Sequence, residues 1–275
     1  SVPAILSTRR IEGRNDRLVT IAILPMMSCA GRLPIYMMFV SALFPSHLQA
    51  TVLFGIYAAG ILLALLCARL LKNTFFKTVQ RDAPHRLKRL RIPSLRKVGL
   101  LMWSRAFMYV RKAGTFILGA SIILWFLNTY PRPEEGTAEN AAAAMEHSYA
   151  GQIGHWMEPV TRVAGFDWKV NSALLGAFAA KEIFVTQMGI LYAVQDGDSG
   201  PEAQQTLNTR LKASYTPLQG ISIMIFCLIA LPCIGTVTVA KREAGTWWFA
   251  LAQFAGLTVM GFVTATVVYQ VGLLL

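Results

Sequence analysis

The stretch ALPCIGTVTVAKRE at residues 230–243 places a proline, a cysteine and a glycine at positions 232, 233 and 235 of a long apolar segment. Proline removes a hydrogen-bond donor from a helix, and glycine weakens a helix by about 1 kcal/mol relative to alanine. A helix through this segment is therefore expected to break beside Cys233. Non-helical backbone is tolerated at membrane depth only where protein buries it or where it lines a cavity. The break thus predicts an internal, protein-enclosed position.

The rest of the chain has the composition of a membrane protein. Of its 275 residues, 55% are hydrophobic and 15% are charged, whereas soluble domains carry about 25% charged residues. The apolar residues fall into runs close to the roughly 20 residues that cross a hydrocarbon core. The sequence therefore predicts an all-α, polytopic helical membrane protein with interrupted transmembrane helices. Helices are expected at 18–44, 49–71, 106–128, 171–194, 217–240 and 246–275.

The positive charge of the chain is concentrated in one loop and its flanks. Residues 69–112 hold thirteen Lys or Arg and one acid, Asp82, which accounts for the whole formal charge of +12. Loops rich in Lys and Arg stay in the cytoplasm, so the loop 72–105 is predicted to be cytoplasmic. The loop 129–170 carries six acids against three basic residues and is predicted to be external. Because a loop between two membrane spans explains the basic run, no nucleic-acid partner is expected.

One topological question stays open from the sequence. If the segments 171–194 and 217–240 each cross the membrane, the residues KRE at 241–243 fall on the outside, against the positive-inside rule. Either one of these segments is re-entrant, or the rule fails for so short a loop.

Two further apolar segments carry breaks or charges. The segment 18–44 contains SCAGRLP, which places Arg32 between two halves too short to span a bilayer. An arginine at mid-depth costs at least about 2.5 kcal/mol, so Arg32 is predicted to face the protein interior or water. The segment 171–194 contains Lys181 and Glu182, which point about 100° apart on a helix. At least one of them is expected to meet a partner or a cavity, and Glu182 is interpreted as a buried carboxylate.

The thiols at the breaks indicate metal chemistry. Interrupted segments in both halves of a chain point to a transporter's binding site, and a thiol beside free carbonyls suits a transition-metal cation. We therefore predict Cys29 and Cys233 as transient metal ligands, with Glu182 as their charge partner. The alternative is that these thiols pack as small apolar side chains, as expected for Cys67 and Cys227 in unbroken stretches. Because all four cysteines lie in apolar segments, a disulfide framework is not expected.

Four stretches follow one known pattern in the right order along the chain: SVPAILSTRRIEGRNDRLVTIAILPMMSCAGRLPIY, AFMYVRKAGTFILGASIILWFL, GFDWKVNSALLGAFAAKEIFV and LPCIGTVTVAKREAGTWWFAL. With these stretches the chain resembles the ferrous iron transporter B family, FeoB. The resemblance implies two gate-like repeats. Residues 1–71 would hold the first gate region and the following helix, 72–105 the basic loop, and 106–275 the second gate region with its external loop.

The resemblance also implies a function and partners. It implies import of Fe²⁺ across the cytoplasmic (inner) membrane, with iron as the transported substrate and with no permanently bound cofactor. The family places a GTP-binding domain before its membrane domain, whereas this sequence contains no G-x-x-x-x-G-K-[ST] motif. We therefore expect the chain to be the C-terminal membrane portion of a larger protein. A small accessory protein and a homo-oligomer are further partners that the resemblance suggests, beside the lipid bilayer.

Other functions are open at this point. A transporter of a small organic solute such as a nucleoside, built on similar gate repeats, would not need Cys29 or Cys233. An intramembrane enzyme is not expected, because the motifs H-E-x-x-H and G-x-S-x-G do not occur. A non-transporting scaffold would leave Arg32 and the Lys181–Glu182 pair without a role.

Overall fold

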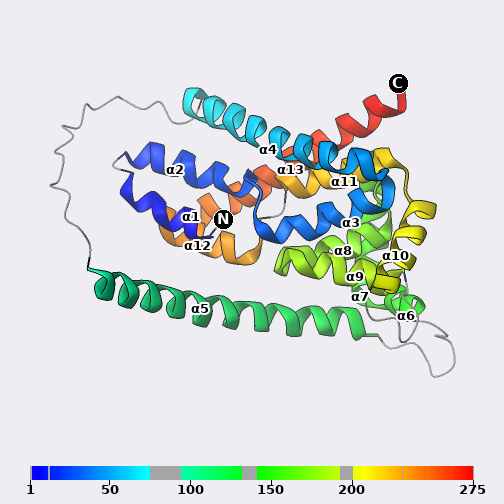
Figure 1. The fold of residues 1–275 in the computed structure, drawn as a ribbon, viewed down its shortest axis with the longest axis horizontal. Coiled ribbons are helices and arrows are strands. Elements are labelled where there is room, and N and C mark those ends of the chain that lie inside the picture. The colour runs from blue at the N-terminus through cyan, green and yellow to red at the C-terminus, as the bar shows by residue number, and fades with distance from the viewer. Residues whose placement is uncertain are drawn as a thin grey trace.

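The computed structural model describes residues 2–11, 13–74, 94–131, 141–192, 201–230 and 232–274, and this part of the chain is helical without strands. The expected all-α membrane fold is confirmed (Figure 1). The helices are α1 (Val2–Ser7), α2 (Arg14–Ile23), α3 (Leu33–Leu43), α4 (Ser46–Thr74), α5 (Leu95–Thr129), α6 (Ala141–His147), α7 (Tyr149–Thr161), α8 (Trp168–Ala179), α9 (Lys181–Leu191), α10 (Pro201–Ser214), α11 (Pro217–Ile229), α12 (Ile234–Ala244) and α13 (Trp247–Leu274). Short 3₁₀ turns are η1 (Thr8–Arg10), η2 (Leu24–Met26), η3 (Ala30–Arg32) and η4 (Arg162–Ala164).

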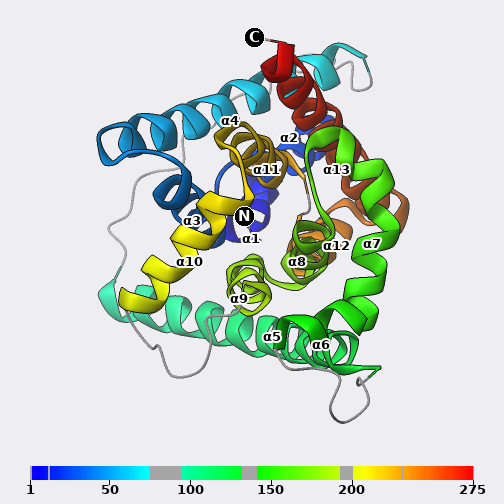
Figure 2. The same cartoon turned by 90° about the vertical axis from the view of Figure 1, so that its right-hand side faces the viewer.

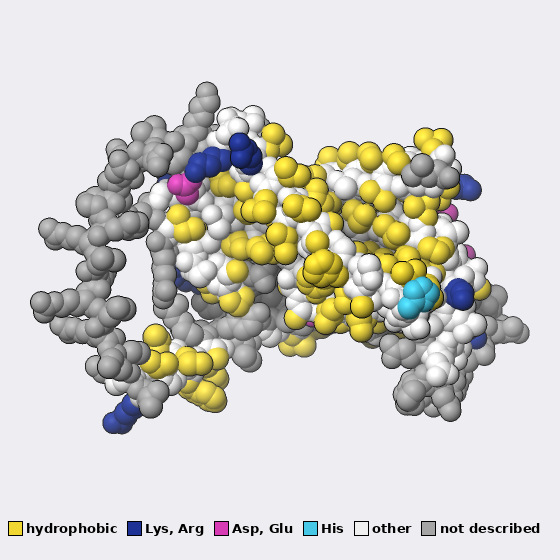
Figure 3. Space-filling view, turned by 45° about the horizontal axis from the view of Figure 1, so that its top comes forward, with side chains coloured by type: hydrophobic (Ala, Val, Ile, Leu, Met, Phe, Trp, Pro, Cys, Tyr) yellow, Lys and Arg dark blue, Asp and Glu magenta, His cyan; other side chains and the backbone are white. Residues whose placement is uncertain are grey.

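Four helical stretches in the described residues are long and apolar enough to cross a membrane: Arg14–Leu43, Ser46–Thr74, Pro217–Ala244 and Trp247–Leu274. They correspond to four of the six expected segments. Apolar side chains cover most of the described surface between the two ends of the face drawn in Figure 3. Such a surface is what a surrounding bilayer requires, because lipid tails offer no partner to charged groups.

The expected segment 106–128 lies inside a longer helix. α5 runs over Leu95–Thr129. Its apolar part, Leu118–Thr129, is shorter than the four stretches that are long enough to cross a membrane. Most of the basic loop, 75–93, lies outside the described residues, as does 132–140 in the predicted external loop. The remainder of that loop forms α6, α7 and η4. The polar region near 195–205 is described only from Pro201, where α10 begins.

The expected segment 171–194 is a hairpin rather than one crossing. Ala180 has extended backbone, with φ −149° and ψ 132°, and separates α8 from α9. α8 and α9 pack along each other, and Lys169 near the start of α8 lies with its Nζ 4.4 Å from the ring centroid of Tyr192 at the end of α9. The segment therefore enters the molecule to about its middle and returns to the same end (Figure 1).

This hairpin answers the topological question at residues 241–243. With α8 and α9 re-entrant, the stretch α11–α12 runs toward the end at which the chain's N-terminal arginines lie. There, Glu243 accepts hydrogen bonds from Arg9 at 2.9 and 3.0 Å to Nε and 2.5 Å to Nη2. It also forms an ion pair with Arg17 at 3.5 Å. The hydrogen bond and the negative charge of Glu243 raise the pKa of Arg9 above its usual value. Lys241 and Arg242 thus share one end of the molecule with the N-terminal basic residues.

The two halves of the chain have opposite directions. The interrupted pair α2–α3 is followed by the long helix α4, and the interrupted pair α11–α12 is followed by the long helix α13. α4 ends at the left of Figure 1, whereas α13 ends at the right. Viewed from the right-hand end, α3, α8, α9 and α11 lie around the centre, with α4, α5, α7 and α13 at the periphery (Figure 2). This inverted arrangement places the interruptions of both helices inside the molecule.

Local sequence explains where the central interrupted helix starts and what packs against its break. Thr216 and Gln219 form a reciprocal capping box at the start of α11, with Pro217 at the first helical position, where proline's missing N–H is not needed. At the other end of α11, Gly261 of α13 lies so close that a Cβ there would be 2.7 Å from the Ala230 Cβ. α13 therefore closes tightly over the break.

Candidate functional site

Three interruptions of the backbone meet near the centre of the molecule. The first lies between η2 and η3, the second at Ala180 between α8 and α9, and the third between α11 and α12. We call the described residues at these interruptions, 26–32, 179–182, 230 and 232–233, the break junction. The tip of the α8–α9 hairpin connects the other two interruptions, because α9 packs against η3 and its first residue bonds to the end of α11.

Lys181 is the buried cation that joins two parts of the break junction. It is 6% exposed, and its Nζ donates hydrogen bonds to the carbonyls of Cys227 at 3.1 Å and Ala230 at 3.4 Å. These carbonyls end α11, where the helix has no further N–H groups to offer and its dipole is negative. The prediction that Lys181 or Glu182 meets a partner is confirmed for Lys181.

Arg32 makes equivalent hydrogen bonds to backbone carbonyls at the other interrupted helix. It is 1% exposed, and its Nη1 donates to the carbonyls of Met26 at 3.3 Å and Met27 at 3.2 Å. The prediction that Arg32 faces the interior is confirmed. In each half of the molecule, a buried cationic side chain thus satisfies the carbonyls at the end of the first half-helix.

The expectation that Glu182 is buried is wrong. Its side chain is exposed in the described structure, since Lys181 takes the inward direction and the next residue points about 100° away. Glu182 still borders the break junction: a Cβ on Gly31 would lie 2.7 Å from its Oε1. Glycine at this position permits that approach. The carboxylate also lies in the first turn of α9, where the helix dipole favours negative charge.

Cys29 and Cys233 occupy equivalent positions in the two interrupted helices. Each is the residue before a helical turn, η3 for Cys29 and α12 for Cys233, and each is followed two residues later by glycine. Both are partly exposed free thiols, and both lie within electrostatic range of Lys181. The Cys233 Sγ lies 3.2 Å from the Thr236 Oγ1. The structure therefore brings the three predicted ligands to the borders of one junction.

These ligands do not form a closed metal site. Among the described residues, no group of three or more His, Cys, Asp or Glu side chains is arranged to hold a metal ion. Arg32 and Lys181 bring two positive charges to the same junction as one carboxylate, Glu182, and two thiols. In cysteine the thiolate is the form that binds metals.

Sequence reasoning missed a polar cluster beside Arg32. The Ser28 Oγ, the Arg32 Nε and the Tyr36 OH are buried without hydrogen-bond partners in the described structure. Buried polar atoms are nearly always hydrogen-bonded, so these three groups add polar character to the interior beside Arg32. The spacing of 28, 32 and 36 was a usable signal, since residues four apart share a helix face. The break between η2 and η3 hid it.

Cys67, Cys227 and a histidine of the loop 129–170 lie outside the break junction or within the packing. The Cys67 Sγ contacts the Met260 Sδ at 3.4 Å between α4 and α13, and Cys227 is buried in the core. Both observations agree with apolar packing. His155 pairs with Glu158 at 3.5 Å and Glu146 at 3.6 Å, within the helices of the predicted external loop.

These features define a class. Two interrupted helices of opposite direction, a re-entrant hairpin and buried cations at their meeting point are the construction of a membrane transport domain. Two family profiles match the chain: Gate, described as nucleoside recognition, over residues 110–247, and the ferrous iron transport protein B C terminus over residues 53–105. The chain belongs to the ferrous iron transporter B family, as its membrane portion.

Curated relatives extend the similarity over the whole chain. An Fe(2+) transport protein A/Fe(2+) transporter FeoB fusion protein of Porphyromonas gingivalis is 36% identical over all of this chain and 36% of its own length. The Fe(2+) transporter FeoB of Methanocaldococcus jannaschii is 36% identical over 100% of this chain and 40% of its own. That of Campylobacter jejuni is 33% identical over 96% and 43%. The chain thus spans about two-fifths of the length of these relatives, and no solved structure matches it.

The border position of Glu182 gives a first prediction. Glu182→Gln is expected to slow Fe²⁺ transport severalfold, because it removes the carboxylate that lies beside Gly31 and that offsets part of the positive charge of Arg32 and Lys181. Glu158→Gln serves as the matched control, since Glu158 pairs with His155 outside the break junction and its loss should leave transport unchanged. Initial uptake of labelled Fe²⁺, normalised to protein in the membrane, measures both. Equal rates in the two variants would remove Glu182 from the site.

Proposed function

We propose that this chain forms the path by which Fe²⁺ crosses the cytoplasmic membrane, as the membrane part of a longer protein. The observation that carries the proposal is the break junction, which Cys29, Cys233 and Glu182 border and at which Lys181 is buried. The curated relatives that match nearly the whole chain are named Fe(2+) transporters. Thiolate and carboxylate ligands together suit a borderline transition-metal ion better than an organic solute.

A nucleoside substrate is the second candidate, and it is less favoured. The Gate profile carries the description of nucleoside recognition, but the relatives that cover both halves of the chain are named for iron. Nucleobases are bound in proteins largely by aromatic stacking. The described residues of the break junction itself offer thiols, charges and small or apolar groups, and none of them carries an aromatic ring.

Reconstitution separates the two candidates. The full-length parent protein in proteoliposomes is expected to take up labelled Fe²⁺, kept reduced with ascorbate, and to take up labelled adenosine no faster than empty vesicles. A thiol-blocking reagent should slow the iron flux, because Cys29 and Cys233 are partly exposed. Uptake of adenosine faster than in empty vesicles, at a rate that thiol blocking does not change, would favour the organic-solute transporter and contradict the proposal.

The partners follow from the same proposal. Transport by the parent protein would be coupled to an N-terminal GTP-binding domain of the same polypeptide, and iron would be cargo that leaves again, since conduction requires modest affinity. We propose further that this portion performs no catalysis itself. A small accessory protein and a homo-oligomer remain parts of the proposal that come from family resemblance.

Sidedness gives a second prediction. We expect 72–105 to face the cytoplasm and 129–170 the outside, with residues 241–243 on the cytoplasmic side, because Glu243 binds Arg9 and Arg17 there. Single cysteines placed in the two loops of a variant lacking the native thiols would be exposed to a membrane-impermeant maleimide in whole cells. Label at 129–170 with protection at 72–105 is the expected outcome, and the reverse pattern would invert the topology.

A further inference from the structure

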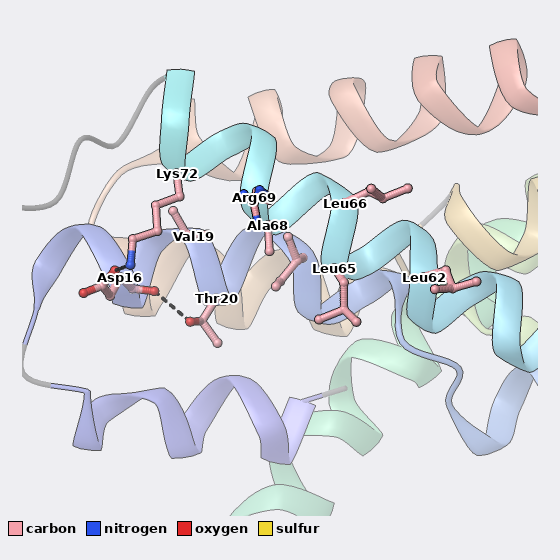
Figure 4. A pocket seen from close by; sticks show the side chains of 10 residues that line it. Asp16, Val19, Thr20, Leu62, Leu65, Leu66, Ala68, Arg69 and Lys72 are labelled. Carbon is pink, nitrogen blue, oxygen red and sulfur yellow. Dashed lines mark hydrogen bonds and ion pairs between the residues drawn. The ribbon is translucent and has the colours of Figure 1, made fainter.

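An apolar groove runs between α2 and α4, away from the break junction (Figure 4). It encloses about 560 Å³ and is lined mainly by apolar side chains, with polar groups at one end. Leu62 and Leu65 of α4 are 61% and 62% exposed, and Val19 and Ile23 of α2 line the groove from the other side. The groove is thus open to the surroundings of the protein along the surface between α2 and α4.

The groove is amphipathic along its length. Its polar end holds Asp16, Arg69 and Lys72, and its other end holds only apolar residues. From Leu62 to Lys72 the helix rises about 15 Å, which is half the roughly 30 Å thickness of a hydrocarbon core. A groove that is apolar over one leaflet and polar where that leaflet ends has the dimensions of a single phospholipid.

Charge decides which phospholipid fits. Arg69 is exposed and has no hydrogen bond or ion pair with the residues that the structure describes. Lys72 pairs with Asp16 at 3.5 Å, and both side chains are partly exposed, at 57% and 38%. The net charge at this end of the groove is therefore +1, and the following loop belongs to the stretch 69–112 that carries twelve excess positive charges. Such a surface attracts anionic headgroups.

We propose that this groove binds one anionic phospholipid of the leaflet on the side of the loop 72–105. One acyl chain lies along Leu62, Leu65 and Ile23, and the phosphate lies against Arg69 and Lys72. Asp16 competes with the phosphate for Lys72, so the same contact that tethers α4 to α2 also limits the affinity for the lipid.

Native mass spectrometry of the full-length parent in neutral detergent tests the site. The protein would be titrated with dioleoylphosphatidylglycerol and, separately, with dioleoylphosphatidylcholine. We expect the first phosphatidylglycerol to bind about tenfold more tightly than phosphatidylcholine. In Arg69→Gln/Lys72→Gln this preference should disappear, since each basic group near a membrane surface contributes about fivefold to anionic-lipid binding and the two together account for the whole preference. Leu65→Trp, which fills the groove, should weaken binding of both lipids.

Two further variants separate a built site from general attraction to positive charge. Arg96→Gln removes an exposed cation of α5 outside the groove and should leave the preference intact. Asp16→Asn should raise phosphatidylglycerol affinity severalfold, because Lys72 is then free to bind the phosphate, an effect opposite in sign to that of a merely destabilising change. The melting temperature of each variant, measured in the same detergent, would show that it is folded.

Three results would overturn the proposal. One is an unchanged lipid preference in Arg69→Gln/Lys72→Gln, and another is an equal loss of preference in Arg96→Gln. The third is equal competition by soluble glycerol phosphate, which would assign the charge to a free phosphate site without a place for an acyl chain. A full-length protein that binds neither lipid would equally contradict the proposal. None of these results bears on iron transport.

Discussion

Replacing Lys181 by methionine is expected to reduce the transport rate to about a tenth of the wild-type rate or less and to lower the melting temperature of the protein. Methionine has a similar length, but it leaves the carbonyls of Cys227 and Ala230 without the donor that now lies 3.1 and 3.4 Å away. A buried acceptor left unsatisfied costs about 1–3 kcal/mol. The loss also disconnects the hairpin tip from the end of α11, which is the contact that holds two of the three interruptions together.

Two further substitutions serve as controls for Lys181→Met. Lys181→Arg keeps the charge and the donors and should retain a larger share of both stability and transport, although the planar guanidinium fits a tight site less well. Lys169→Met removes a lysine from the same hairpin, where its Nζ lies over the Tyr192 ring, and should affect transport little. Melting temperature in detergent and uptake of labelled Fe²⁺ are the measurements. A Lys181→Met protein with wild-type values in both would contradict the role assigned to this side chain.

The second large effect is expected from the two thiols at the interruptions. Cys29→Ser and Cys233→Ser should each slow Fe²⁺ uptake by about tenfold or more, because serine lacks the soft thiolate that a transition metal prefers. If both act on one ion, the double variant should be little worse than the poorer single variant. Independent sites would instead add within about 0.5 kcal/mol.

Cys67→Ser is the matched control for this series. Its thiol lies in an unbroken helix against Met260, so the substitution should leave uptake near the wild-type rate. Initial uptake at matched protein levels, in cells that express the full-length parent, measures all four variants. Wild-type rates in the double Cys29/Cys233 variant would end the thiol-ligand hypothesis, and the path would then depend on carbonyls, water and Glu182.

The candidate site was largely visible in the sequence as a set of residues, but its roles were not. Cys29, Arg32, Lys181 and Cys233 were singled out because breaks and charges are costly inside a bilayer. The sequence did not distinguish Lys181 from Glu182, and the choice of the buried carboxylate was wrong. Neighbouring residues of a helix point in different directions, and only the packing of α9 against η3 and α11 decides which of them is buried.

What the sequence by itself determined is the local chemistry of each segment. Apolar runs of spanning length predict membrane helices, and the residues around Pro232, Gly235 and Gly31 predict where helices stop. The interior position of Arg32 follows as well. Each of these conclusions rests on the cost of a missing hydrogen bond or an unpaired charge, which acts within one segment wherever that segment lies.

Only the tertiary structure decided how the segments are combined. It made 171–194 a re-entrant hairpin, it placed Lys181 at the end of α11, and it paired Arg9 with Glu243, 234 positions apart in the chain. An isolated segment of this length is compatible with one crossing or with a hairpin, because both satisfy its backbone hydrogen bonds. The difference in free energy comes from contacts between distant segments, such as the carbonyls that Lys181 satisfies, and such contacts exist only once the helices have packed.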